Sequence, residues 1–240
     1  LFTKLVAWNA QQTIYKHVSH HKKKMRILKY ILLLSLFISC QQKSEKKKIT
    51  SDLKSDLIKD EINRASEFLP EPGIYERLKG QKMNIDNLES QNKLKLEIFV
   101  KEPNNETLTL VINENWPEII ETTYNVWKNE NENIVKIGEF PFSESGDWEI
   151  EYEHYFDKKG RTFVFERNTS FFNSICAEGI AYEKITEFYN LDFNRIDRNY
   201  SLIDKNKTEL KKENCEMNYD FPFEVYNNLK NYQNEINYGG

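Results

Sequence analysis

Apolar and polar residues alternate through much of the chain after residue 93, and this period of two predicts β-strands. From Leu94 to Val100 every second residue is apolar, and after a turn at 103–105 the same spacing returns from Leu108 to Ile112. Because successive side chains of a strand point to opposite faces of a sheet, two such runs joined by a short turn predict a β-hairpin.

A second hairpin is predicted further along the chain. From 148 to 154 bulky side chains alternate with three glutamates, and the turn sequence at 157–160 leads into another strand at 161–167. Less regular strands are expected at 119–128, 134–139, 179–189 and 196–203, with a further turn at 204–207. Since successive strands joined by short turns usually pair with their neighbours, these segments together predict an antiparallel meander.

A helix is expected at each end of this meander. The segment 51–69 places its apolar residues on one face, begins with a serine that can cap a helix, and ends before two prolines. Near the other end, Pro222 suits the first turn of a helix on which Val225, Leu229 and Tyr232 share a face. We therefore predict one α+β domain over 51–240, large enough to bury a core of its own.

An apolar run with the layout of a secretory signal precedes these elements. Arg26 and Lys29 give it a positively charged start, residues 30–38 are mainly apolar, and Ser39 places a small residue before Cys40. A membrane-spanning helix needs about 20 apolar residues, and a polar segment follows the cysteine at once. The run therefore predicts a signal peptide and not a transmembrane helix.

The end of this run, Leu36-Phe37-Ile38-Ser39-Cys40, resembles the lipobox of bacterial lipoproteins. In that family the cysteine receives a diacylglycerol thioether, becomes the new N-terminus after cleavage and is usually N-acylated. The resemblance implies a signal peptide over 25–39, lipidation of Cys40 and a tether over 40–50, with 1–24 as upstream sequence outside the mature protein. Several acyl chains anchor a protein stably, so the expected partner is a membrane and the expected location the cell envelope.

The composition adds a stylistic resemblance. The chain is rich in Lys, Asn, Glu and Ile and carries Gln41 after the lipidated position, which is similar to the uncharacterised small lipoproteins of Bacteroidetes, especially flavobacteria. That group implies the outer membrane, with its periplasmic or surface face left open, and implies no activity. The alternative interpretation is that 27–38 forms a buried core helix and that Cys40 is an ordinary buried thiol.

A mature chain that starts at Cys40 is strongly acidic. All 38 acidic residues follow Cys40, whereas seven of the 34 basic residues precede it, so 27 basic residues accompany 38 acidic ones and the formal charge is −11. Such a charge repels phosphate backbones and argues against a nucleic-acid partner. Of four histidines only His154 remains, which makes a His-based zinc site or a serine–histidine triad hard to build, and we expect neither metal nor cofactor.

Two cysteines remain once Cys40 is lipidated. Cys176 and Cys215 form an even pair in a chain expected to reach an oxidising compartment, so a disulfide between them is predicted. Closing a loop of that length stabilises a fold by roughly 4 kcal/mol in the chain-entropy model. Two separate buried thiols are the alternative, because the sequence alone does not show whether the two Cα atoms are close.

The 148–156 strand carries the weak catalytic candidates of the chain. Glu149, Glu151 and Glu153 share one face, and alternate Cβ atoms on a strand lie roughly 7 Å apart, a spacing that permits glycosidase-like carboxyl separations. A solvated charge row is the commoner use of such a face. His154 points to the other face, where it is either a general base or, more commonly, a hydrogen-bonded histidine at the edge of the core.

No phosphate-binding glycine loop, nucleophile elbow or Cys-x-x-Cys pair occurs in the sequence. We therefore expect a non-catalytic binding or accessory lipoprotein that presents its domain to a glycan, peptide or protein partner. The first alternative is an envelope hydrolase for glycan or peptidoglycan that uses the strand carboxylates with or without His154. The second alternative is a lipid carrier, which requires a continuous apolar cavity.

Overall fold

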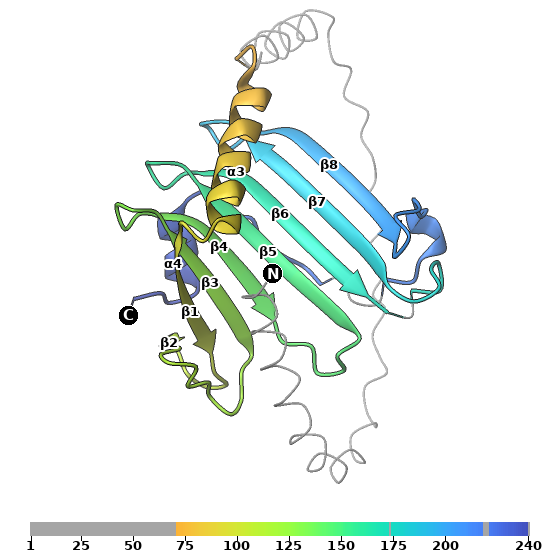
Figure 1. Cartoon of the computed structure of the whole chain (residues 1–240), viewed down its shortest axis with the longest axis horizontal. Coiled ribbons are helices and arrows are strands. Elements are labelled where there is room, and N and C mark those ends of the chain that lie inside the picture. Colours follow the sequence, from red (N-terminus) through yellow and green to blue (C-terminus); the bar gives the residue numbers. More distant parts are fainter. Residues whose placement is uncertain (1–70, 173, 218–220, 240) are drawn as a thin grey trace, which may run out of the picture. The chain divides into compact units, whose positions relative to one another are not determined.

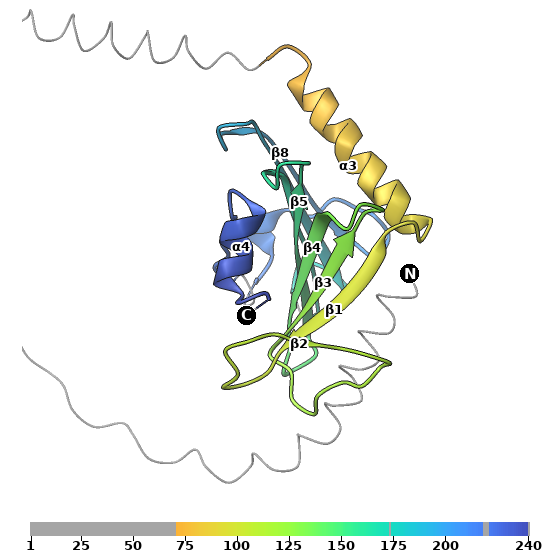
Figure 2. The ribbon, with the colours of Figure 1, turned by 90° about the vertical axis from the view of Figure 1, so that its left-hand side faces the viewer.

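In the part of the chain that the structure describes, two helices lie on opposite faces of one antiparallel sheet (Figures 1 and 2). This computed structural model describes residues 71–172, 174–217 and 221–239. Helix α3 (Ile74–Ser90) lies on one face, and helix α4 (Leu229–Glu235) lies on the other. The predicted α+β class, with a mainly antiparallel meander and a helix near each end of the described region, is confirmed.

The sheet has eight strands in the order β2-β1-β3-β4-β5-β6-β7-β8 among the described residues. All neighbouring pairs are antiparallel, and only β2 departs from chain order by pairing with the outer edge of β1. The strands are β1 (Lys95–Lys101), β2 (Thr109–Leu110), β3 (Thr122–Lys128), β4 (Ile134–Pro141), β5 (Trp148–Phe156), β6 (Thr162–Phe171), β7 (Ala181–Tyr189) and β8 (Arg195–Asp204). Both predicted hairpins, β1–β2 and β5–β6, are confirmed.

Four hairpin tips, 129–133, 157–161, 190–194 and 204–208, are built in the same way. Each begins with Asn or Asp, whose side-chain oxygen accepts hydrogen bonds from the N–H groups of the third and fifth residues. The fourth residue of each tip has a positive φ, and its N–H bonds back to the carbonyl of the first. This is the turn-plus-bulge loop that matches the twist of antiparallel strands.

Helix α3 begins directly after Gly73, whose φ of 77° turns the chain into the helix. Ile74, Leu78 and Ile85 recur at helical spacing and are buried in one core cluster with residues of β3, β5, β6 and β7. This helix was not predicted from the residue pattern. The helix predicted over 51–69 lies outside the described residues.

The C-terminal segment corrects one prediction. Pro222 does not start a helix, and residues 221–227 have no helical structure. Helix α4 begins after Asn228, whose side chain caps it by accepting the N–H of Asn231 at 2.9 Å. The side chain of Thr162 donates to the carbonyl of Tyr226 at 2.6 Å and fixes this segment to β6. Hydrogen bonds to strand ends compete here with the helical start that a proline favours.

A disulfide joins Cys176 and Cys215, with 4.7 Å between their Cα atoms, as predicted. It connects the β6–β7 loop to the segment that follows β8 and a short 3-10 turn (Lys212–Asn214). Cys215 packs against a core cluster that contains Phe171, so the bridge closes the end of the sheet opposite the tips 157–161 and 190–194.

Candidate functional site

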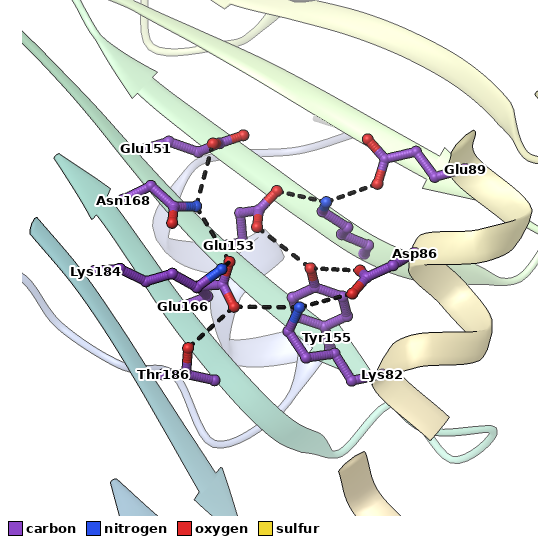
Figure 3. A network of polar contacts seen from close by, with 11 residues as sticks. Lys82, Asp86, Glu89, Glu151, Glu153, Tyr155, Glu166, Asn168, Lys184 and Thr186 are labelled. Carbon is purple, nitrogen blue, oxygen red and sulfur yellow. Dashed lines mark hydrogen bonds and ion pairs between the residues drawn. The ribbon is translucent and has the colours of Figure 1, made fainter. Parts of the chain in front are cut away.

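A groove of about 960 Å³ opens between the second half of α3 and the sheet face of β4 to β7 (Figure 3). We call it the α3 groove. Glu183 of β7 borders it, but strand alternation directs that side chain to the opposite face, where it pairs with Arg167 and Lys212. The charged side chains on the groove face are Lys82, Asp86 and Glu89 from α3, Lys136 from β4, Glu149, Glu151 and Glu153 from β5, Glu166 from β6 and Lys184 from β7. Charged residues are rarely buried unless they are paired, so their arrangement defines the site.

Strand register brings these side chains onto one face. Lys136 of β4 lies opposite Tyr155 of β5, and Glu153 of β5 lies opposite Glu166 of β6. Glu166 in turn lies opposite Thr186 of β7, so four neighbouring strands contribute side chains to the groove face. Two glutamates directly opposite each other repel and destabilise a sheet. The lysines around them supply the compensating charge.

Lys136 is the most deeply buried cation of the groove, with 3% of its surface exposed. Its ammonium group forms ion pairs with Glu153 and, at 2.8 Å, with Glu89 of α3. It also lies over the rings of Trp127 and Tyr155, at 4.5 and 5.1 Å from their centroids. Burial disfavours the charged form, but the attraction of both carboxylates outweighs it and raises the pKa of Lys136 above its ordinary value.

Glu166 is the centre of the second half of the network. Its carboxylate pairs with Lys184 and, at 3.2 Å, with Lys82, and it accepts hydrogen bonds from Thr186 at 3.1 Å and from Asn168 at 3.3 Å. The amide of Asn168 also donates to Glu151 at 3.3 Å. One asparagine therefore links two carboxylates on adjacent strands (Figure 3).

Tyr155 connects the two halves. Its hydroxyl donates to Asp86 at 2.9 Å and also contacts Glu153 at 3.3 Å, while Lys82 lies 4.7 Å from its ring centroid. Burial and the surrounding carboxylates hold the pKa of Tyr155 well above its ordinary value, so it stays a hydrogen-bond donor at neutral pH. Lys82 is likewise kept protonated, because Glu166 and Asp86 raise its pKa despite the opposing effect of burial.

The three glutamates predicted to share one face do so, and all three line the α3 groove. Glu151 and Glu153 are buried, whereas Glu149 is exposed. The structure joins Glu153 to a lysine and Glu151 to an asparagine. These contacts hold charge in fixed positions, an arrangement suited to recognition of a polar ligand.

His154 lies on the opposite face and does not join the glutamates. It is 1% exposed and is surrounded by the rings of Phe156, Phe165, Tyr226 and Tyr232. Its Nε2 accepts the backbone N–H of Tyr226 at 3.2 Å, which ties the C-terminal segment to β5. Burial lowers the pKa of His154 to about 3, so the ring is neutral at physiological pH.

Sequence reasoning missed the lysines and Glu166. One signal was present, since Lys136 interrupts the apolar start of a strand that also contains Gly138. The glycine leaves room for the Trp127 ring, because a Cβ there would lie 3.1 Å from the ring atom Cζ3. An isolated lysine on a half-buried strand beside a glycine and near a tryptophan can thus indicate a buried cation.

Among the residues that the structure describes, no group of three or more His, Cys, Asp or Glu side chains is arranged to hold a metal ion. None of the described helices is both long and apolar enough to cross a membrane. The proposed signal peptide and Cys40 lie outside the described residues. Comparison with models of protein families, with curated proteins and with solved structures finds no match.

Proposed function

We propose that this protein is a non-catalytic binding module, anchored to the outer membrane of the cell envelope through lipid on Cys40, that holds its ligand in the α3 groove. The observation that carries the proposal is the pairing of the buried glutamates. Lys136 engages Glu153, and two lysines engage Glu166. His154, the remaining candidate for acid–base chemistry, is enclosed on the other face.

The charge of the groove suggests the ligand class. Six carboxylates accompany three lysines on the groove face of α3, β4, β5, β6 and β7, so this face keeps a formal excess of three negative charges. Charge complementarity steers association and selects partners. We therefore propose a ligand rich in hydrogen-bond donors and carrying positive charge, namely a glycan with free amino groups.

Glu149 offers the most direct test of this ligand class because it is exposed and its replacement should leave the fold intact. We expect Glu149→Gln to weaken binding of a glucosamine oligomer by about two- to fivefold, the scale of one exposed charge. Isothermal titration calorimetry measures the effect, with Glu178→Gln, an exposed residue outside the groove lining, as the matched control. The N-acetylated oligomer, which lacks the charge, should bind equally to both variants.

Two results would contradict the proposal. Equal affinity of the charged and N-acetylated oligomers would remove the charge argument. Reproducible hydrolysis of a polysaccharide or of peptidoglycan, lost when Glu151 or Glu153 is changed to Gln, would instead support the envelope hydrolase.

The lipid anchor is tested separately. We expect Cys40→Ser, expressed in a diderm bacterial host, to move the protein from the membrane fraction to the aqueous fraction, because the thioether-linked lipid can no longer form. Mass spectrometry of the membrane-extracted wild type should show a diacylglycerol adduct on Cys40. An unlipidated Cys40 in a chain that still carries Met25 would refute the anchor.

A further inference from the structure

A second cavity, of about 430 Å³, lies beside another face of α3, along the helix from Ile74 to Leu88, and reaches the other end of the strands. Its wall is formed by α3 and by three of the hairpin tips, 129–133, 157–161 and 190–194. The apolar part of the lining includes Leu78, Ile85, Leu88, Val135, Phe163 and Leu191. We call this space the tip pocket.

The tip pocket is larger than packing defects usually are. Protein interiors leave few voids bigger than a water molecule, whereas small-molecule sites measure roughly 300–1,000 Å³ and are mainly apolar with a few polar groups. The three strands that end at these tips shift register at Trp127/Lys128, Tyr155/Phe156 and Phe188/Tyr189. Such bulges bend a strand and increase its twist. Three bulges at the same end of the sheet can therefore bend the ends of β3, β5 and β7 away from α3 and leave the pocket between them.

The mouth of the tip pocket is positively charged, in contrast to the acidic α3 groove. Lys158 and Lys159 are exposed on the β5–β6 tip, and Arg77 of α3 and Arg161 also line the pocket. Asp157 is the only acidic residue in the described lining, and it pairs with Arg161 at 2.6 Å. The excess of cations favours an anionic group at this position.

An apolar residue also reaches the mouth. Leu191 on the β7–β8 tip is 60% exposed although it borders the pocket. An apolar surface beside a cationic rim matches a molecule with an apolar chain and a negatively charged head. Phe163 and Val135, on the sheet side, and Leu78, on the helix side, give the chain two walls.

We infer that the tip pocket binds a single-chain anionic amphiphile, with its alkyl chain under α3 and its carboxylate beside Lys158 and Lys159. This site is distinct from the α3 groove, so it can be present whether or not the groove binds a glycan. The ligand is a monomeric fatty-acid-like molecule and not a bilayer surface, because the apolar lining lies in a recess between a helix and a sheet.

Chain length provides the first test and needs no substitution. With the full chain of the protein, calorimetric titration of octanoate, nonanoate and decanoate should show affinity rising about fourfold per methylene, the effect of burying one CH₂ group. Dodecyltrimethylammonium, with the opposite charge, should bind at least tenfold more weakly than dodecanoate. Affinity that does not depend on chain length would overturn the inference.

A charge reversal tests the position of the head. The double variant K158E/K159E should bind dodecanoate about tenfold more weakly and lose the preference over dodecyltrimethylammonium. K205E/K207E is the matched control, since it makes the same change of charge in the similarly built tip 204–208, which lies at the opposite end of β7 and β8 and outside the pocket lining. Equal loss in both variants would show a non-specific charge effect and would refute the site.

A cavity-filling change tests the position of the chain. Leu88→Trp should abolish the gain from octanoate to decanoate, while circular dichroism confirms the fold; an unchanged gain would place the chain elsewhere. Binding only to vesicles of anionic phospholipid, with none to monomeric dodecanoate, would assign the cations to a membrane surface and contradict the inference.

Discussion

The His154→Gln variant is expected to lose much less stability than the wild type when the pH falls from 7 to 4.5. In the folded protein burial lowers the pKa of His154 to about 3, whereas an unfolded chain has a histidine pKa near 6.5. Between these two values the unfolded state binds a proton that the folded state does not. The free energy of unfolding therefore falls as the pH drops through this window, by roughly 3 kcal/mol at pH 4.5 relative to pH 7.

The substitution is chosen to keep the contact and remove the titration. A glutamine amide oxygen can accept the N–H of Tyr226 in place of Nε2. The phenols packed against the ring stay neutral in this window, because burial raises the pKa of Tyr226 to about 12 and raises that of Tyr232 well above its ordinary value. Tyr232 donates to Glu139 at 2.9 Å, and the pKa of Glu139 is raised by burial, an effect present in both proteins.

Urea unfolding at a series of pH values between 7 and 4.5 measures the difference. The free energy of unfolding of the wild type should fall more steeply with decreasing pH than that of His154→Gln. If the wild type is only slightly more stable at pH 7, it should be the less stable protein at pH 4.5. Parallel curves for the two proteins would mean that His154 does not titrate in this way.

Removing the ammonium group of Lys136 is expected to destabilise the fold by about 3–5 kcal/mol, because it leaves buried carboxylates without their counter-charge. Lys136→Met keeps most of the aliphatic length of the side chain but removes the cation–π contacts of the ammonium group with the Trp127 and Tyr155 rings. Glu153, only 4% exposed at its side chain, then loses its ion pair. The ammonium group of Lys136 is therefore needed to compensate the buried carboxylates, even though the complete Lys136–Glu153 pair need not be strongly stabilising.

A double variant separates these two effects. Lys136→Met with Glu153→Gln should recover most of the lost stability, because the neutral amide no longer needs a counter-charge. Lys95→Met is the control, since Lys95 pairs with Glu97 and Glu132 on the exposed side of β1 and should change stability little. Chemical denaturation gives all three values. A double variant as unstable as Lys136→Met alone would show that the loss comes from the ring contacts and packing of Lys136 and not from an uncompensated Glu153.

The strands were predictable because their residues obey a local rule. A period of two is enough to assign the glutamates of β5 to one face and His154 to the other. Helix α3 was not predicted, because its few apolar residues are diluted by polar ones and Gly80 interrupts the pattern. The start of α4 was placed too early, because hydrogen bonds to Thr162 hold the segment after Pro222 against the sheet.

The site was less predictable than the fold. Glu153 and Glu166 become neighbours through the register of β5 and β6, and Glu89 reaches Lys136 only because α3 crosses the same face. Such contacts join residues 13 to 47 positions apart in the chain. A sequence pattern reports the face on which a side chain lies but not its partner on another element.

The common construction of the four hairpin tips has a consequence for how this domain can change. Each tip is closed by its first residue and by the positive φ of its fourth, so the side chains of its second and third residues carry little structural constraint. At 158 and 159 these unconstrained positions are occupied by the lysines of the tip pocket, while the equivalent positions of the tip 190–194 hold Leu191 and Asp192. Substitutions at the second and third residues of these tips can therefore change the ligand preference of the tip pocket while the rest of the sheet stays unchanged.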